Sequence, residues 1–412
     1  MKCDEQKPSC HVCLRHGVGC LYTTPKPYVK TSTPGAASSH SLPQGERSSS
    51  SLPSLPGHDN DGGASGLELR LFHYFISHTR HGLRETDEFW GIRAPLIAFE
   101  YRTVFDAMLA LAALHMYRQI LDNTFIFDRS SAFHNSQNAW TLHGRFLAGR
   151  SSREIYEAYM HYFDSAVKGQ RSLMQEADLR AAYVVSALIS VISLVSLGLD
   201  VPEELRSKMQ PATSYLWFTL AIGPRELVPL WIQRSGVESL RETGVYDDEP
   251  DFKNVEELFD PKHALPFEDL LTFGAEFETI TEAESVAYQQ ALSYIGLIYA
   301  NLVGRLEEPL VTSRRYVALP GRVPPAFSDM VLQQRPRALA ILAHAFATMR
   351  LLEAEVPWYR GIAAKQVPCI AASLPPAWQK AMNWPLAMLS VSASERGHLP
   401  DLKISKFRLA TR

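Results

Sequence analysis

The sequence predicts an all-α protein whose main part is one large helical domain. From Leu67 onward, apolar residues recur at spacings of three and four, which is the repeat of one helical face. Strand-like alternation of apolar and polar residues is scarce, and prolines fall mostly between the periodic runs, where helices begin or end. The predicted organisation is a cysteine-rich head at residues 1–30, a flexible linker at 31–66 and the helical domain at 67–400.

The composition of the 412-residue chain is typical of a folded, water-soluble protein. Hydrophobic residues make up 46% of the chain and charged residues 21%, with a formal net charge of -3. This balance differs from that of a disordered or a membrane protein, and the small net charge selects no class of partner. Because the first residues are charged or cysteine, no secretory signal is expected.

The head is defined by clustered cysteines. Four of the five cysteines lie in the first twenty residues, with six, two and six residues between successive members: Cys3, Cys10, Cys13 and Cys20. A disulfide framework would suit a small secreted domain, which nothing here indicates. Thiolates two residues apart can hold one tetrahedral zinc ion, and zinc would supply the folding energy of so short a segment. The site is either all-thiolate or has His11 or His16 in place of one thiolate.

The string Cys-Asp-Glu-Gln-Lys-Pro-Ser-Cys, together with the closing Cys20-Leu21-Tyr22, resembles the second part of the fungal zinc binuclear cluster. Six cysteines hold two zinc ions in that family. By this resemblance the four head cysteines correspond to its third to sixth ligands, and Pro8 to its turn proline. The resemblance implies a nuclear transcription factor of RNA polymerase II that binds DNA at CGG triplets. The basic residues assigned to DNA contact are Lys2, Lys7 and Arg15.

The family's first two ligands and most of its basic run have no counterpart in the printed sequence. One hypothesis is that the protein begins further upstream and reads DNA directly with that run, which would make Met1 an internal methionine. The alternative is a DNA-blind form that acts as a co-regulator or a competitor through the helical domain. We expect at most one zinc ion in the chain as printed; a metal-free head is the structural alternative.

The linker is predicted from composition. Serine, proline and glycine dominate from Thr31 to Gly66, as in the stretch Ser48–Gly57, and apolar residues are too few to offset the entropy of ordering the segment. No heptad pattern follows the head, so no coiled-coil dimerisation element is expected there.

The helical domain is predicted as a series of amphipathic runs that bury their apolar faces against one another. The run Ala181–Leu199 is the most apolar and is interpreted as a buried core helix; hydropathy alone leaves a membrane-spanning helix as the alternative, although no membrane span is expected. The predicted helical runs are 69–76, 104–115, 153–174, 177–199, 202–221, 225–235, 282–304, 335–355 and 376–390.

Fragments of this domain, taken in order, resemble the regulatory domain of a zinc-cluster subgroup that includes the sterol uptake control proteins. The fragments are Leu71–Thr79, Phe89-Trp90, Ala107–His115, Tyr159–Phe163, Ala340–His344, Trp358–Gly361 and Trp384-Pro385. The resemblance implies a pocket for a sterol-like or other apolar ligand, and a homodimer formed through this domain is also expected. The alternative is that these apolar and aromatic residues only form the core, as helical apolar stripes usually do.

Several histidine, cysteine and acidic residues of the helical domain are expected to have structural and not functional roles. His115 is expected to be a hydrogen-bonded core histidine, and Cys369 a small buried residue. The acidic run Glu353–Glu355 is expected at the solvated surface. A metal site is not expected from three histidines whose spacing does not place them on one helical face: His73, His78 and His81.

No catalytic motif is recognisable in the sequence. A phosphate loop, a dinucleotide fingerprint, a nucleophile elbow and a zinc-protease helix are all absent from it. The chain is therefore predicted not to be an enzyme. The alternative is a catalytic site assembled from distant residues, and the lining of any pocket distinguishes the two: convergent titratable groups indicate an enzyme, apolar walls a ligand-binding or interaction domain.

Overall fold

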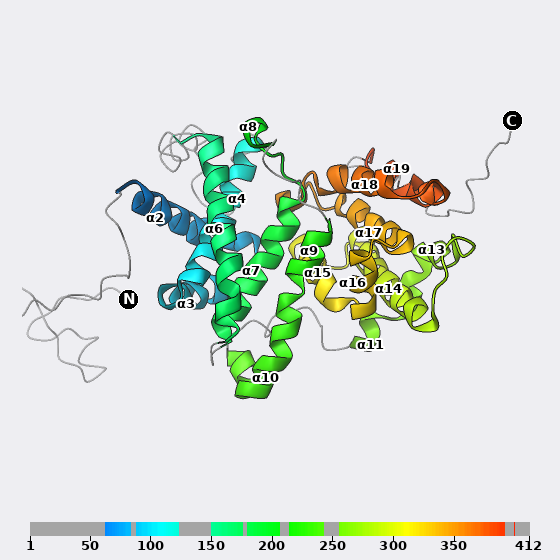
Figure 1. The fold of residues 1–412 in the computed structure, drawn as a ribbon, viewed down its shortest axis with the longest axis horizontal. Helices are drawn as coiled ribbons and strands as arrows, with labels where there is room; N and C mark the ends of the chain where they lie inside the picture. The colour runs from blue at the N-terminus through cyan, green and yellow to red at the C-terminus, as the bar shows by residue number, and fades with distance from the viewer. Residues whose placement is uncertain are drawn as a thin grey trace, which may run out of the picture. The chain divides into compact units, whose positions relative to one another are not determined.

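The computed structural model describes residues 62–83, 88–122, 150–175, 179–206, 214–242, 255–391 and 399. Within these ranges every regular element is a helix and none is a strand, which confirms the predicted all-α class (Figure 1). Residues 1–59 cluster as a separate unit from residues 60–412 and lie outside the described ranges. The predicted head and most of the predicted linker therefore stay untested.

The first helices along the chain pack together as one group, here called the N-terminal group. Helix α4 is its centre and contacts α2, α3, α6 and α7, while α7 also contacts α9 and α10. The elements are α2 (Gly62–Ser77), η1 (Thr79–Gly82), η2 (Phe89–Arg93), α3 (Ala94–Glu100), α4 (Arg102–Leu121), α6 (Ser152–Leu173), α7 (Arg180–Ser196), α8 (Glu203–Arg206), α9 (Ser214–Ala221) and α10 (Gly223–Glu242).

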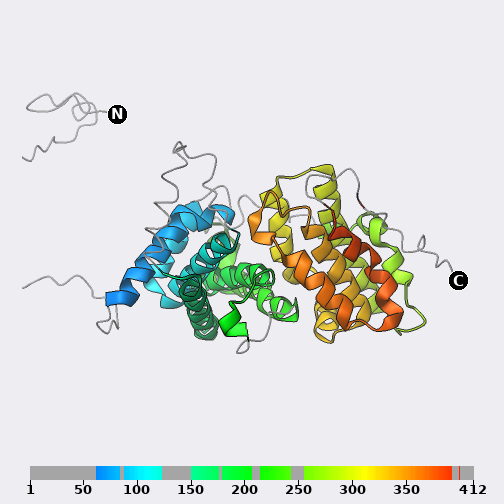
Figure 2. The same cartoon turned by 90° about the horizontal axis from the view of Figure 1, so that it is seen from above.

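The remaining helices form the C-terminal group, which lies beside the N-terminal group in Figure 2. Helix α17 is its centre and contacts α14, α16, α18 and α19, whereas α15 and α16 contact α7, α9 and α10 of the other group. The elements are α11 (Val255–Leu258), α12 (Pro261–Ala264), η3 (Leu265–Phe267), α13 (Asp269–Thr272), α14 (Glu282–Gly304), α15 (Pro309–Arg322), α16 (Pro325–Leu332), α17 (Pro336–Met349), η4 (Pro357–Tyr359), α18 (Ile362–Ser373), η5 (Pro376–Met382) and α19 (Asn383–Met388).

The central helices α4 and α17 are buried on nearly all sides. Every residue of α17 from Arg337 to Met349 is buried, and α4 is buried from Asp106 to Leu114. A helix that is apolar all round belongs in a protein core or in a membrane. Among the described helices α4 is long and apolar enough to cross a membrane, but 72% of its most apolar window is buried by its neighbours.

The predicted core helix Ala181–Leu199 is confirmed as α7, although it contains four serines. Three of these serines lie in a chain in which each hydroxyl donates to a backbone carbonyl of the same helix. Ser190 Oγ is 2.8 Å from Ser186 O, Ser193 Oγ is 3.0 Å from Ser190 O, and Ser196 Oγ is 2.8 Å from Ser193 O. These three serines therefore pack in the helix without an unsatisfied hydroxyl.

Helix starts follow from local sequence. Ser151 and Glu154 form a capping box at α6, and Thr281 and Glu284 form one at α14, with Thr281 N 2.7 Å from Glu284 Oε2. The same bond holds the pKa of the Glu284 carboxyl below its usual range. The predicted runs 153–174 and 282–304 accordingly agree with α6 and α14.

Glycine allows the close crossing of α12 and α14. A Cβ atom on Gly296 would lie 1.8 Å from the carbonyl oxygen of His263, so no other residue fits without a shift of the backbone. The crossing places η3 and α13 against the C-terminal group's core.

His344 is buried in the C-terminal group. Its ring stacks on Trp384 with centroids 5.3 Å apart, and its Nδ1 lies 2.8 Å from the carbonyl oxygen of Ala340. A carbonyl oxygen only accepts, so Nδ1 carries the proton and donates. Burial lowers the pKa of His344 to about 4, which keeps the ring neutral.

The structure corrects three predicted helical runs. The run 202–221 contains two helices, α8 and α9, and residues 207–213 between them lie outside the described ranges. The run 335–355 ends as a helix at Met349, and the run 376–390 is a 3₁₀ helix followed by the short α19. The predicted runs leave out seven α-helices of the described ranges: α3, α11, α12, α13, α15, α16 and α18.

Two single-residue expectations are wrong. Cys369 is exposed on α18, because it falls on the face of that helix away from α17. Glu353 is buried, with 6% of its surface exposed, because it folds back to pair with Arg350. The neighbouring Glu355 is exposed, as expected of that acidic run.

Candidate functional site

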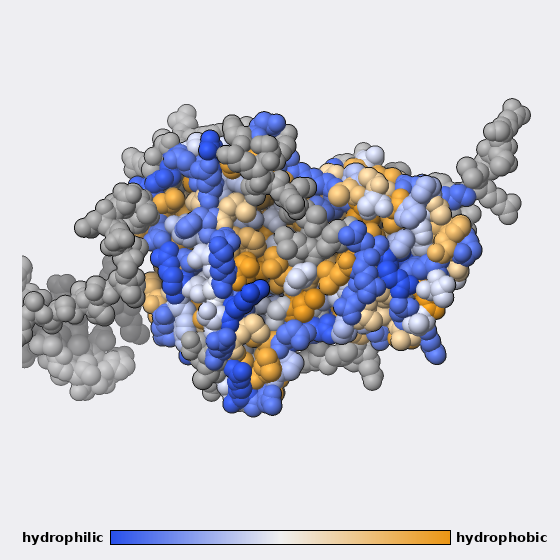
Figure 3. Space-filling model, viewed as in Figure 1, coloured by the Kyte–Doolittle hydropathy of each residue, from blue (hydrophilic) through white to orange (hydrophobic). Residues whose placement is uncertain are grey.

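A cavity of about 360 Å³ lies where the two helical groups meet. Its walls come from α7, α10 and α15, and it is closed by residues of η1, η2 and η4. Apolar side chains also gather along the middle of the face in Figure 3, with polar side chains on both sides. The cavity volume is in the range of small-molecule sites in proteins.

Aromatic rings form one end of the cavity. Phe89 and Trp90 of η2 line it together with Trp358 and Tyr359 of η4. Gly82 allows this meeting, because a Cβ atom there would lie 2.2 Å from the Trp358 indole nitrogen. Four residues from two of the sequence fragments quoted above therefore lie around one space.

His115 supports this end from behind. Its ring lies 4.5 Å from that of Trp358, and its two nitrogens are each 3.1 Å from a partner, Thr79 Oγ1 and Gln119 Nε2. The Gln119 carbonyl oxygen accepts from the Tyr74 hydroxyl at 2.5 Å, so the Gln119 amide donates to His115 and the ring donates to Thr79. The expectation of a hydrogen-bonded, structural histidine is confirmed, although the residue is only partly buried.

Three hydroxyl groups of the cavity wall donate to backbone carbonyl oxygens. Ser190 donates to Ser186 O, Ser313 donates to Leu310 O at 2.7 Å, and Tyr359 donates to Ser313 O at 2.5 Å. Burial raises the pKa of Tyr359, so its hydroxyl stays protonated. None of these groups is activated as a nucleophile by a neighbouring base in the described lining.

The charged residues of the described lining are all arginines: Arg225, Arg314 and Arg322. Aspartate, glutamate and histidine are absent from that lining. Arginine does not titrate in proteins, so these residues can hold an anion but cannot act as a general acid or base. The arrangement favours ligand binding over catalysis.

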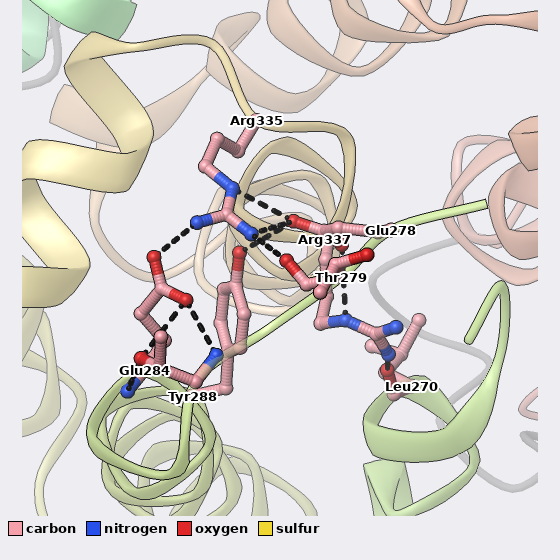
Figure 4. Close-up of polar contacts among 8 residues, drawn as sticks. Leu270, Glu278, Thr279, Glu284, Tyr288, Arg335 and Arg337 are labelled. Carbon is pink, nitrogen blue, oxygen red and sulfur yellow. Dashed lines mark hydrogen bonds and ion pairs between the residues drawn. The ribbon is translucent and has the colours of Figure 1, made fainter. Parts of the chain in front are cut away.

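A second polar cluster joins distant segments of the C-terminal group (Figure 4). Glu278 accepts from Arg335 Nε at 2.9 Å, from Arg337 Nε at 3.2 Å and from the Tyr288 hydroxyl at 3.0 Å. Arg335 also pairs with Glu284. We call this set, Glu278, Glu284, Tyr288, Arg335 and Arg337, the Glu278 network.

The Glu278 network links segments of the C-terminal group through ion pairs within the chain. Two carboxylates balance two guanidinium groups, and Arg337, which is fully buried, also donates to Leu270 O and lies 5.2 Å from the Trp378 ring centroid. Burial raises the pKa of Tyr288, which therefore stays protonated as a donor. The cluster ties α13, α14 and α17 together, and each guanidinium group is paired with a carboxylate of the chain.

The residues assigned to metal and DNA lie outside the described ranges, so the structure does not test these assignments: Cys3, Cys10, Cys13, Cys20, Lys2, Lys7 and Arg15. Among the residues that are described, no group of three or more histidine, cysteine or acidic side chains is placed to hold a metal ion. The sequence interpretation missed the three cavity arginines, for which no motif exists.

Comparison with known proteins shows a distant relationship over most of the chain. The Zn(2)-C6 fungal-type transcription factor afumD of Aspergillus fumigatus is 24% identical over 360 residues, which cover 84% of this chain and 82% of that protein. A Zn(2)-C6 fungal-type transcription factor of Gibberella zeae is 24% identical over 454 aligned positions, covering 96% of this chain and 84% of that protein. No family model and no solved structure matches the chain.

The chain is therefore related to fungal Zn(2)-C6 transcription factors. Transcription factors are not enzymes, and the prediction that this chain is not an enzyme is confirmed on that ground.

Proposed function

We propose that the protein is a zinc-dependent, sequence-specific DNA-binding regulator of RNA polymerase II transcription that acts in the nucleus. One observation supports this most: a chain related to fungal Zn(2)-C6 transcription factors over most of its length also has four cysteines at residues 3–20, with six, two and six residues between successive members. The helical domain is then the regulatory part, similar to that of the sterol uptake control subgroup.

Zinc is held in this proposal by Cys3, Cys10, Cys13 and Cys20, because four thiolates are a donor set that suits one tetrahedral zinc ion. The ion stabilises a head that is too short to form a hydrophobic core. Lys2, Lys7 and Arg15 contribute positive charge toward the DNA phosphates.

The experiment has two steps. The 5′ end of the transcript is mapped first, to test whether a Cys-x2-Cys pair and a basic run precede Met1. The encoded protein is then titrated with duplexes that contain CGG triplets or a scrambled sequence, and fluorescence anisotropy reports binding. We expect tight binding to the CGG duplex that is lost with a zinc chelator and in Cys13→Ser, but retained in Cys369→Ser, the exposed cysteine of α18.

Equal binding to both duplexes, or binding that survives the chelator, contradicts the proposal. A protein that regulates transcription without binding either duplex would be the DNA-blind co-regulator instead.

The cavity between the helical groups supports a ligand-sensing role for the helical domain. Its walls are mostly apolar, and the described lining has no aspartate, glutamate or histidine. We include in the proposal that this cavity binds an apolar small molecule and that the domain forms a homodimer. Sedimentation of the full chain, with a mass of two chains expected and one chain contradictory, tests the homodimer.

A further inference from the structure

We propose that an exposed apolar surface on α2, η2 and α3 is the interface at which a second copy of this chain binds. The inference rests on the homodimer proposed above and names the surface that forms it. This surface, here called the α3 patch, comprises Leu69 and Phe72 of α2, Ile92 of η2, and Leu96 and Phe99 of α3.

The apolar residues of η2 and α3 form one outward stripe. Ile92, Leu96 and Phe99 follow one another at spacings of four and three, which places them on one helical face, and each is more than half exposed. The opposite face, with Ala94 and Ile97, is buried, and α3 contacts α4 and α7. A surface helix normally carries polar residues on the side away from the core, so the apolar outer face needs an explanation.

Helix α2 widens this stripe into a patch. The ring of Phe72 contacts that of Phe99, with centroids 5.6 Å apart. Leu69 lies one turn before Phe72 on the same side of α2 and is also more than half exposed. A contiguous apolar surface with a charged rim is typical of a site that binds a protein or a membrane.

The charges beside the patch favour a protein with both signs of charge on its surface. Among the described residues at its edge, three are acidic and three are basic: Glu68, Glu88, Glu100, Arg70, Arg93 and Arg102. A membrane surface or a nucleic acid would be matched by a mainly basic rim. A balanced rim is instead matched by another balanced rim, such as that of a second copy of this chain.

The order of charges along η2 and α3 is self-complementary. Arg93 and Glu100 are seven residues apart on one side of the helix, and Leu96 lies about midway between them. In an antiparallel pair of these helices with a twofold axis at Leu96, Arg93 of each copy meets Glu100 of the other. The same arrangement sets Ile92 of each copy against Phe99 of the other. The interface therefore has an apolar centre and two ion pairs at its edge.

The existing partner of Arg93 does not prevent this contact. Its guanidinium lies 2.9 Å from the carboxylate of Glu88, and the two side chains are 40% and 69% exposed. An exposed ion pair of this kind contributes little to stability. Arg93 can therefore exchange Glu88 for Glu100 of a second copy at low cost.

The start of α2 gives a functional reason for a second copy. Helix α2 begins at Gly62, about 10 Å along the helix from Leu69, and the 61 residues before it include the predicted head. Two copies that pair through the α3 patch therefore join these segments beside one interface. In the function proposed above, two DNA-binding heads that are tethered together bind two half-sites more tightly than separate chains do.

The test is sedimentation equilibrium of the full 412-residue chain over a range of concentrations. We expect a reversible equilibrium that reaches the mass of two chains. Leu96→Glu places two like charges at the twofold axis, and we expect it to raise the dissociation constant by more than about 30-fold, as for a central interface residue. Leu306→Glu, the matched control at an exposed leucine of the C-terminal group, should leave the dissociation constant unchanged.

Charge reversal at the rim shows whether the partner is a second copy. Arg93→Glu alone and Glu100→Arg alone each set like charges against each other, and we expect each to raise the dissociation constant by about tenfold. An equimolar mixture of the two variants should regain the affinity of the unmodified chain, because each variant supplies the charge that the other lacks. Lys168→Glu, the control on the exposed face of α6, should have no effect. The regained affinity requires both variants to fold, so the test does not depend on a loss alone.

A dimer that is weakened neither by Leu96→Glu nor by the two charge reversals contradicts the α3 patch and leaves the homodimer standing. The mass of one chain at every concentration contradicts both, whether residues 1–61 or a membrane covers the patch. Flotation with phosphatidylcholine–phosphatidylserine vesicles that Leu96→Glu abolishes would assign the patch to a membrane and overturn the proposal. Absence of zinc-dependent DNA binding in a chain that dimerises through the patch would contradict the proposed regulator and leave the interface.

Discussion

The cavity and the Glu278 network are both places where arginines lie inside the fold, yet they differ in what surrounds the charge. In the network, each guanidinium meets a carboxylate of the same chain, and Arg337 is fully buried. In the cavity, three partly exposed arginines lie among mostly apolar lining residues, and one of them, Arg225, donates to Val323 O. The first arrangement pairs opposite charges of the same chain and joins segments of one helical group. The second encloses a space of about 360 Å³ where the two groups meet.

The largest expected effect is on the network. In Glu278→Gln the buried Arg337 loses its carboxylate, and we expect the free energy of unfolding to fall by about 3–5 kcal/mol, the usual cost of breaking a buried ion pair. Urea denaturation measures this change. The matched control is Glu157→Gln on α6, whose pair with Arg153 is about half exposed and should contribute less than about 1 kcal/mol. Equal effects of the two substitutions would remove the distinction between the network and a surface pair.

The next largest effect is on the pH dependence of folding stability, to which the buried His344 contributes. Its folded-state pKa of about 4 lies below the ordinary value of 6.5, so as the pH falls the unfolded chain takes up the proton first. The folded state therefore loses stability between about pH 6.5 and pH 4, by about 3 kcal/mol in total, and keeps it fully above that window. Urea denaturation across this range, with His344→Gln removing this part of the slope, is the measurement.

The matched control for His344 is the exposed His161 on α6. His161→Gln should keep the slope of the unmodified chain. If His344→Gln keeps the slope as well, burial of a neutral His344 is contradicted.

The smallest effect concerns the aromatic end of the cavity. In Gly82→Ala the new methyl group would overlap the Trp358 ring, and we expect a loss of about 1–3 kcal/mol together with a shift in tryptophan fluorescence. In Gly66→Ala on α2 the methyl group meets nothing within 4 Å, and stability should be unchanged or rise by up to about 1 kcal/mol. A Gly82→Ala protein as stable as Gly66→Ala, with unshifted fluorescence, would argue against the close packing of Trp358 on residue 82.

Periodicity was enough to predict the longest helices but missed α15 and α18, which have 14 and 12 residues. The capping boxes and apolar repeats of α6 and α14 are local, and the predicted runs agree with these helices closely. Helix α18 was missed because Pro368 interrupts its pattern, although the structure accommodates that proline inside the helix. The run 335–355 was extended too far because Leu351 and Leu352 continue the apolar pattern beyond the last helical turn.

The cavity could not be predicted because its lining is assembled from segments far apart in the sequence. Val191, Arg225 and Arg322 each look like an ordinary core or surface residue of a helix, and only the packing of α7, α10 and α15 brings them together. The predictions that Cys369 is buried and Glu353 exposed were wrong for a related reason. Burial is set by which face of a helix or turn meets its neighbours, and residue type alone does not fix that face.

The central claim, a metal-binding DNA regulator, is tested most directly by counting zinc in the purified full chain with elemental analysis. The account predicts one zinc ion per chain as printed, lost in Cys13→Ser and retained in Cys369→Ser, because four head thiolates suit one tetrahedral ion. Absence of zinc, or zinc that survives in Cys13→Ser, would contradict it, and two ions per chain would contradict the four-thiolate site.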